Sequence, residues 1–309
     1  MSDAVDVNDD GGAGVPTLAA VWERKRGFCI GVFVAAALLV LVSFFRSFVD
    51  IVTNWNLPDS LYSHALIIPP ISLFFVWRLR TRLLGMPVEP SLLGYPVLAL
   101  GCGMLLLGDF LGFMTIVHLA LLPVLTGLCL LFLGRKHTQT LWFSLAFLFF
   151  MIPMPYTLTS GLSFQSKMLA TESAVALGKT LTLHMVQDGS YVYIGDAGDR
   201  LLVGDVCGGM RSLVALLAFG ALMAYVSKAR WWAKILILLV SPAIAILANV
   251  SRIFFLCVVG YVWGSDMATG WVHDISGIGI FAVAFALLFS VEAALRKFAP
   301  EHDVESQDS

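Results

Sequence analysis

The sequence is poor in charge: charged residues make up 13% of its 309 residues, whereas 59% are hydrophobic. An average soluble domain carries about 25% charged residues, so a soluble domain of this composition would lack the polar surface that it needs. A chain this apolar is stable in lipid, where an apolar exterior is favourable. The sequence also lacks a basic tract and has a formal net charge of −2, so nothing in it favours a nucleic-acid partner.

The first 20 residues do not have the features of a secretory signal peptide. They are mostly small or acidic, and they lack a basic start followed by an apolar core. We expect residues 1–22 to form a disordered cytoplasmic tail. The first apolar run follows Arg24, Lys25 and Arg26 and is long enough to be an uncleaved membrane anchor. Residues 23–298 are then the transmembrane domain, and residues 299–309 a second cytoplasmic tail.

Cysteine is scarce and unpaired: the chain has five, an odd number, and no Cys-x-x-Cys motif. The pattern therefore predicts neither a disulfide framework nor a metal site, and no cofactor is expected. Cys29, Cys102, Cys129 and Cys257 fall inside apolar runs, where a cysteine packs as a small hydrophobic residue. Cys207 differs, because its neighbours are polar and rich in glycine.

Long apolar runs are what the sequence has in abundance. A membrane span needs roughly 20 mostly apolar residues. Eight segments meet or approach this length, which predicts an all-α polytopic membrane protein with about eight transmembrane helices. They cover approximately residues 27–49, 64–78, 91–108, 112–133, 141–158, 206–226, 233–262 and 273–294.

The basic residues between these spans predict how the chain is oriented. Thirteen of the 19 Lys and Arg residues fall on one side, four on the other, and two lie within spans. By the positive-inside rule, both termini are cytoplasmic. An even number of spans agrees with that arrangement.

The largest segment on the outer side is then about 159–206. Its first half, 160–185, has Ala170, Ala174, Leu177 and Leu181 at helical spacing, which predicts an amphipathic helix on the outer membrane surface. Its second half, 187–203, alternates in a way typical of strand, turn and strand. We therefore expect a small extracytoplasmic β-hairpin directly before the sixth span.

Two arginines lie within predicted spans, where a charge costs about 2.5–3.5 kcal/mol. Arg211 follows Cys207 by four residues, so in a helix starting near 206 they would share a face. The helix N-terminus and this positive charge favour a thiolate at Cys207, whereas Asp205 opposes it or caps the helix. Gly208 and Gly209 would leave room for a substrate. The alternative is that the glycines pack helices and the cysteine is inert.

Arg252, the second arginine, lies three residues after Asn249 and shares a face with it. Its alternative role is structural, paired with a backbone carbonyl. His273 and Asp274 lie where the chain re-enters the membrane, and a lone histidine there is ordinarily a solvated polar residue. Cys207, Arg252 and His273, however, come from three different helices and lie toward the same outer side. Their convergence predicts an active site.

These residues resemble the exosortase and archaeosortase family of membrane transpeptidases. The segment 206–213, VCGGMRSL, is close to the family's Cys-Ser-Gly-Leu-Arg-Ser-Leu segment. Residues 249–253, NVSRI, are similar to its Asn-x-x-Arg-Ile element, and His273 followed by Gly277 matches a third.

Weaker support comes from residues 62–64, which include an outward His64 with no second supporting feature, and from residues 149–155. The resemblance spans roughly residues 25–295. One departure is Gly208, which stands where the family usually has serine.

The resemblance implies a catalytic site of Cys207, Arg252 and His273. Such an enzyme cuts a C-terminal sorting signal, made of a Pro-containing motif, a transmembrane helix and a basic tail. It acts at the outer face of the cytoplasmic (inner) membrane. Its partners are proteins bearing that signal, membrane lipid, and an envelope acceptor such as lipid or polysaccharide.

Our hypothesis for the reaction is acyl transfer through a thioester on Cys207, with His273 as acid and base and Arg252 stabilising negative charge. Arg211 and Asn249 would orient these groups, and Gly208, Gly209 and Asp274 would support them. A transporter or channel using Arg211 and Arg252, or a non-catalytic assembly factor for surface-polymer export, are the alternatives.

Overall fold

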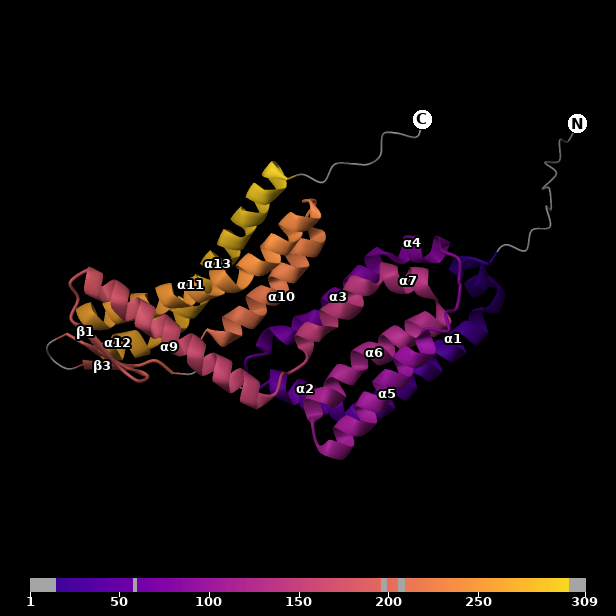
Figure 1. Ribbon diagram of the computed structural model, residues 1–309, viewed down its shortest axis with the longest axis horizontal. Coiled ribbons are helices and arrows are strands. Elements are labelled where there is room, and N and C mark those ends of the chain that lie inside the picture. Colours follow the sequence, from indigo (N-terminus) through magenta and orange to yellow (C-terminus); the bar gives the residue numbers. More distant parts are fainter. Residues whose placement is uncertain (1–14, 58–59, 196–198, 205–208, 300–309) are drawn as a thin grey trace, which may run out of the picture. The chain divides into compact units, whose positions relative to one another are not determined.

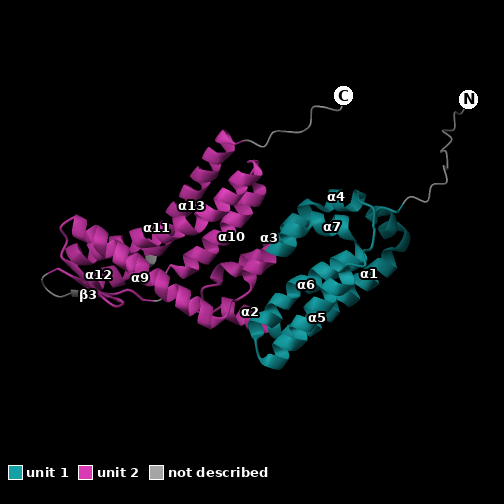
Figure 2. Ribbon diagram, viewed as in Figure 1, with its two compact units in different colours: residues 1–47, 71–146 teal, residues 48–70, 147–309 magenta. Residues whose placement is uncertain are grey.

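The computed structural model describes residues 15–57, 60–195, 199–204 and 209–299, except for the side chains of Asp199 and Asp274. The chain divides into two compact units, which are described separately (Figure 2). The first comprises residues 1–47 and 71–146, and the second comprises residues 48–70 and 147–309. The boundaries fall within α2 (Phe45–Trp55), α3 (Ile68–Arg78) and α8 (Trp142–Phe147).

The first unit is built on the antiparallel pair α5 and α6 (Figure 1). Gly94, Gly101 and Gly108 are buried on one face of α5, and the space that their side chains would fill holds residues of α6. Small residues allow helix backbones to approach closely, which is how helices pack in lipid. The helices that lie wholly in this unit are α1 (Leu18–Ser43), α4 (Arg80–Gly85), α5 (Gly94–Leu111), α6 (Met114–Phe132) and α7 (Arg135–Thr140).

The second unit holds the long helix α11 (Trp231–Trp263), against which α9, α10, α12 and α13 pack. Its remaining helices are η1 (Ser63–Ile67), η2 (Leu148–Met151), α9 (Tyr156–Thr180), α10 (Met210–Val226), α12 (Ser265–Thr269) and α13 (Trp271–Phe298). All the described residues that carry the predicted active site lie in this unit.

A three-stranded antiparallel sheet lies between α9 and α10 in the sequence. Its strands are β1 (Met185–Asp188), β2 (Tyr191–Ile194) and β3 (Asp199–Leu202), in that order. In the register, Val192 faces Gln187 on one side and Leu201 on the other. The predicted hairpin is therefore confirmed in β2 and β3, and β1 is a third strand that sequence reasoning missed.

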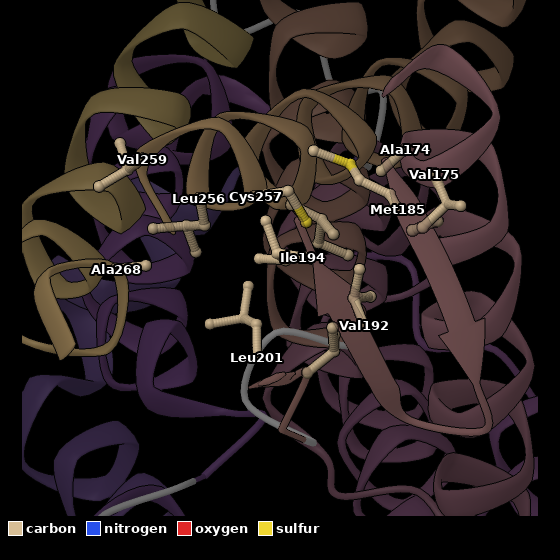
Figure 3. Packing of buried hydrophobic residues seen from close by; sticks show 13 residues of the cluster. Ala174, Val175, Met185, Val192, Ile194, Leu201, Leu256, Cys257, Val259 and Ala268 are labelled. Carbon is tan, nitrogen blue, oxygen red and sulfur yellow. The ribbon is translucent and has the colours of Figure 1, made fainter. Parts of the chain in front are cut away.

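The sheet is held in place by a hydrophobic core shared with α9, α11 and α12 (Figure 3). Val192, Ile194 and Leu201 point from the sheet toward Leu256 and Cys257 of α11. Cys257 is fully buried there, which confirms its predicted packing role. A second core joins α10, α11 and α13 around Leu216, Ile237, Ile244 and Leu288. Through these two cores, the sheet that precedes α10 and the helices α10 and α13 all pack around α11.

The helical polytopic membrane fold is confirmed, and the chain is a multi-pass membrane protein. Among the residues that the structure describes, five helices are long and apolar enough to cross a membrane. The bent pair Trp142–Met151 and Tyr156–Thr180 adds a sixth if it is one span, and Ser63–Arg78 and Met210–Val226 are shorter apolar helices. The predicted number of eight membrane spans stays a prediction.

Two boundaries differ from those expected. The helix α1 begins at Leu18, inside the segment 1–22 that the sequence predicts as tail. The segment 141–158 is not one straight helix, because the chain bends by 78° between Met151 and Tyr156. Pro153 and Pro155 lie in this break, and proline cannot supply the N–H that an uninterrupted helix needs there.

The helix predicted at 160–185 forms as α9, but it packs on protein. Ala170 and Ala174 are buried against α11, whereas Leu177 and Leu181 of the same predicted stripe are exposed. Lys167, a charged residue within this amphipathic segment, is only 6% exposed, and its ammonium lies 5.4 Å from the ring centroid of Phe164. The buried face of α9 is therefore set by contact with α11.

Candidate active site

The centre of the site is a set of hydrogen bonds between α11 and α13. Arg252 of α11 donates from Nε to Ser276 Oγ at 3.3 Å and from Nη2 to the carbonyl oxygen of His273 at 3.2 Å. Its Nη2 also lies 3.3 Å from His273 Nε2. Ser276 in turn donates to the His273 carbonyl at 2.8 Å. Arg252 and His273, two of the three predicted catalytic residues, are thus in direct contact.

The hydrogen bond from the Arg252 guanidinium determines which nitrogen of the His273 imidazole carries the proton. Arginine has only donors, so a hydrogen bond from Nη2 requires His273 Nε2 to be an acceptor without a proton. In that arrangement the imidazole is neutral and carries its proton on Nδ1. This is the form that can receive a proton at Nε2 or donate one from Nδ1.

One donor group of Arg252 is not used within the described part of the chain. The contacts to His273 and Ser276 occupy Nε and Nη2, and no described residue accepts from Nη1. The carbonyl contact is the structural role that sequence reasoning kept as the alternative, and it coexists with the contact to the imidazole. Arg252 is therefore positioned by α13 and still has two N–H groups to offer.

The segment that carries the predicted nucleophile reaches α11 through Gly209. Gly209 is in the left-handed region with φ of 73°, and a Cβ on it would lie 2.7 Å from Asn249 Nδ2 and 2.8 Å from Asn249 Cγ. Asn249 itself is 5% exposed. Because Asn249 is one helical turn before Arg252, this contact brings residue 209 to the same stretch of α11 that holds the guanidinium.

The predicted start of the sixth helix is wrong by four residues. Helix α10 begins at Met210, after the left-handed Gly209, and not near 206. The helical spacing that was expected to place Arg211 on the same face as Cys207 therefore does not apply. Cys207 and Gly208 lie outside the described residues, as does the side chain of Asp274.

Arg211 is the second residue of α10, and its Nε is buried without a hydrogen-bond partner among the described residues. A buried donor left unpaired costs about 1–3 kcal/mol. Arg211 makes no hydrogen bond to Arg252 or to His273.

Two residues near Arg252 were absent from the sequence-predicted set of functional residues. Ser276 lies three residues after His273 and joins it to the guanidinium, and this spacing along one helix face is the signal that could have found it. Gly277, noted only for the resemblance, leaves room for the arginine: a Cβ there would lie 3.3 Å from Arg252 Nη2. A larger residue at 277 would push the guanidinium away.

A cavity of about 500 Å³ adjoins this network. Arg252 and Ser276 contribute to its wall, and the remaining lining side chains are apolar or aromatic, among them Trp263, Met267 and Trp271. They belong to α11, α12 and α13, so the cavity lies within the second unit. Its chemistry suits an apolar ligand that has a hydrogen-bond acceptor.

The two weaker segments of the resemblance meet elsewhere in the second unit. The backbone N–H of Met154 donates to the phenol oxygen of Tyr62 at 3.0 Å, and Trp55 Nε1 donates to the Met151 carbonyl at 3.1 Å. Burial raises the pKa of the Tyr62 phenol, and the hydrogen bond from Met154 partly offsets that effect. Both ring nitrogens of His64 are buried without a partner among the residues described. The hydrogen bonds from Met154 to Tyr62 and from Trp55 to Met151 hold the bend at 152–155.

No group of three or more His, Cys, Asp or Glu side chains in the described ranges is arranged to hold a metal ion. The four described cysteines are free thiols: Cys29, Cys102, Cys129 and Cys257. Cys257 is enclosed in the core beside the sheet. The described thiols therefore add no further nucleophile to the network around Arg252.

A family model described as transmembrane exosortase matches residues 53–290, which is more than half of the chain. The match includes every residue of the Arg252 network and the segment before α10. Comparison with curated proteins and with solved structures found no match.

Proposed function

Because this chain belongs to the transmembrane exosortase family, we propose that it is a membrane cysteine peptidase and transpeptidase with Cys207 as its nucleophile. Members of the family are generally membrane cysteine peptidases. The single observation that carries the assignment is the contact between Arg252 and His273, at 3.3 Å between Nη2 and Nε2. Two residues 21 apart in the sequence, predicted to act together, meet across two helices.

The covalent chain limits where the nucleophile can be. Cys207 precedes Gly209 by two residues, a stretch of at most about 7 Å. Gly209 lies against Asn249, and Asn249 precedes Arg252 by one turn, about 4.5 Å along the helix. The length of the chain between Cys207 and Gly209 therefore allows the thiol to reach the guanidinium. Asn249 is the residue of α11 against which Gly209, two residues after Cys207, packs.

Arg252 supplies positive charge and N–H donors to the reacting carbonyl. Its Nε and Nη2 are held by α13, so its position is set before substrate arrives. Its Nη1 group then faces a substrate oxygen without reorganisation, which is the arrangement that stabilises an oxyanion most effectively. Removing one such donor typically slows a reaction by about 10²–10³.

The reaction proceeds in two acyl transfers. The Cys207 thiol gives its proton to the neutral His273, the resulting thiolate attacks the scissile carbonyl, and negative charge collects on the carbonyl oxygen beside Arg252. The C–N bond then breaks, and the leaving amine takes a proton from His273, which leaves a thioester on Cys207. An acceptor nucleophile loses its proton to His273 and attacks the thioester, and the released Cys207 sulfur takes that proton back, which restores the thiol and the neutral imidazole. Product carries the acceptor in place of the cleaved segment.

The substrates are proteins with a C-terminal sorting signal made of a Pro-containing motif, a transmembrane helix and a basic tail. The enzyme lies in the cytoplasmic (inner) membrane with both termini in the cytoplasm and its site toward the outer face. The acceptor belongs to the cell envelope. Arg211, Gly208 and Asp274 stay in the proposal as supporting residues.

The test uses the full chain in membranes with a tagged sorting-signal substrate. Cys207→Ala should abolish processing and the thioester-linked adduct, because no other atom replaces the sulfur nucleophile. Cys257→Ala is the matched control, since Cys257 is enclosed in the core and should leave processing intact. Normal processing by Cys207→Ala would overturn the proposal. Loss of function in Arg252→Ala alone, with Cys207→Ala active, would favour a transporter instead.

A further inference from the structure

The cavity beside Arg252 is an elongated groove. Its lining residues on α11 extend from Arg252 to Trp263, eleven residues or about 16 Å of helix. On α13 they extend from Trp271 to Ile280, about 14 Å. One end lies at the connection between the two helices, where Trp263 and Trp271 are 65% and 63% exposed. The groove therefore leads from exposed aromatic rings to the guanidinium.

The polar groups of the groove are concentrated at one place. Arg252 and Ser276 contribute the polar lining side chains among the described residues, and both lie away from the Trp263 end of α11. Arg252 keeps its Nη1 group for a ligand, because its hydrogen bonds to described residues use Nε and Nη2. A ligand that fills the groove thus needs an apolar body and a hydrogen-bond acceptor at the arginine.

We propose that this groove binds an extended, apolar peptide segment of the substrate next to the scissile bond. An extended chain advances about 3.3 Å per residue, so about five residues fit in 16 Å. A peptide brings carbonyl oxygens that must be paired in an apolar environment, and Arg252 supplies donors for one of them. Aromatic walls suit flat, extended segments that lack internal hydrogen bonds.

A lipid chain fits the same walls less well. Hydrocarbon has no acceptor for Arg252. A lipid head group at the arginine would place the polar end away from the tryptophans, which favour the water interface. The peptide is therefore the occupant that satisfies both the apolar walls and the guanidinium. The proposal rests on the function proposed above and names the surface that selects its substrate.

Gly279 offers a direct test, because it lines the groove and a Cβ there would meet nothing within 4 Å. Gly279→Leu should place an apolar side chain in the groove, with a Cβ that meets no neighbour, and lower the processing rate of the tagged substrate about tenfold or more. Gly103→Leu is the matched control: it makes the same change in α5, where a Cβ also meets nothing. An unchanged rate in Gly279→Leu would overturn the proposal.

Photocrosslinking gives a second measurement that does not depend on turnover. A photoreactive benzoylphenylalanine replaces Ile275, which lines the groove and is 58% exposed, in the full chain carrying Cys207→Ala. We expect an adduct with the tagged substrate. The same group at Ile278, 75% exposed but absent from the lining, should give none. Adducts with lipid alone, or equal substrate adducts from both positions, would overturn the peptide assignment.

These outcomes separate the groove from the proposed function. Processing by Cys207→Ala would remove the function itself. Loss of processing in Cys207→Ala, together with a normal rate in Gly279→Leu or no substrate adduct at 275, would remove only the groove.

Discussion

At the scale of single residues, the planar shape of the Arg252 guanidinium matters more than its charge for the contacts that it makes. Its fork reaches Ser276 with Nε and His273 with Nη2, and still leaves Nη1. A lysine carries the same charge on a single ammonium and cannot hold two partners in this fixed geometry while presenting a third donor group. The fork therefore explains why an arginine is needed at 252.

Arg252→Lys should consequently lower the rate of substrate processing by about 100-fold while the protein remains folded. The rate is measured in membranes with the tagged substrate, and folding by thermal unfolding in detergent. Arg296→Lys, an exposed arginine near the end of α13 whose Nε lies 4.0 Å from Glu292, is the control and should process normally. A rate within threefold of the unaltered chain would mean that charge alone suffices at 252.

Gly209 is the residue whose backbone conformation and contacts both exclude a side chain. Gly209→Ala places a Cβ on a residue with φ of 73° and drives it into Asn249. We expect a loss of about 2 kcal/mol or more in unfolding free energy, from the strained conformation and the overpacking together.

Thermal unfolding measures this loss, with Gly161→Ala in α9 as the control because a Cβ there meets nothing. Asn249→Ala should recover part of the stability of Gly209→Ala, since neighbours in contact do not act additively. Strict additivity of the two substitutions would contradict the contact.

At the scale of elements, the first unit shows how glycine spacing sets a helix pair. Gly94, Gly101 and Gly108 recur every seven residues on α5, and their closest neighbours on α6 are Leu131, Val124 and Val117, which are also seven apart. A repeat of seven keeps one seam of a helix pair in contact over several turns. The three glycines therefore determine how closely α5 approaches α6.

Gly101→Leu should separate the pair, because its Cβ would lie 2.7 Å from Val124 Cγ2 and 2.8 Å from the Val124 backbone nitrogen. Backbone cannot move as readily as the end of a side chain, so we expect a loss of about 1–3 kcal/mol in unfolding free energy. Gly103→Leu, two residues away on an open face, is the control. Equal melting temperatures for the two variants would contradict this packing.

The same scale separates what the sequence could predict from what it could not. Apolar length and proline position predicted the helices, and alternation predicted β2 and β3. Strand β1 was missed because Met185–Asp188 has no strong alternation of its own and pairs only once β2 is present. The burial of Lys167 was missed because it depends on packing against the rest of the unit, and not on the period of α9.

Residue types and their order predicted Arg252 and His273, but not the fork that joins them. The spacing of Ser276 from His273 puts both on one helix face, but the contact of Ser276 with Arg252 depends on the distance between α11 and α13, which the sequence does not give. The predicted pairing of Arg211 with Cys207 relied on an unbroken helix from 206. The left-handed Gly209 interrupts that spacing, and a two-glycine run was the available sign of such a break.

At the scale of the whole molecule, the apolar helices place the chain in a membrane, and the distribution of basic residues predicts which side each connection faces. The connection between α10 and α11 holds Lys228, Arg230 and the nearby Lys234, whereas residues 181–209, which include the sheet, contain one Lys or Arg, Arg200. Cationic connections remain in the cytoplasm during insertion. The sheet, and with it the segment that leads to Cys207, should therefore be exposed outside the cell membrane.

Cysteine labelling tests this orientation in intact cells. Asp188→Cys, exposed at the end of β1, and Lys228→Cys, exposed after α10, are each made in a chain that carries Cys207→Ala. A maleimide that cannot cross membranes should label residue 188 in intact cells and residue 228 only after lysis. The parent chain without an added cysteine gives the background from the thiols of the apolar helices. Because both positions are exposed in the fold, a reversed pattern of labelling would invert the topology and place the proposed site on the cytoplasmic face.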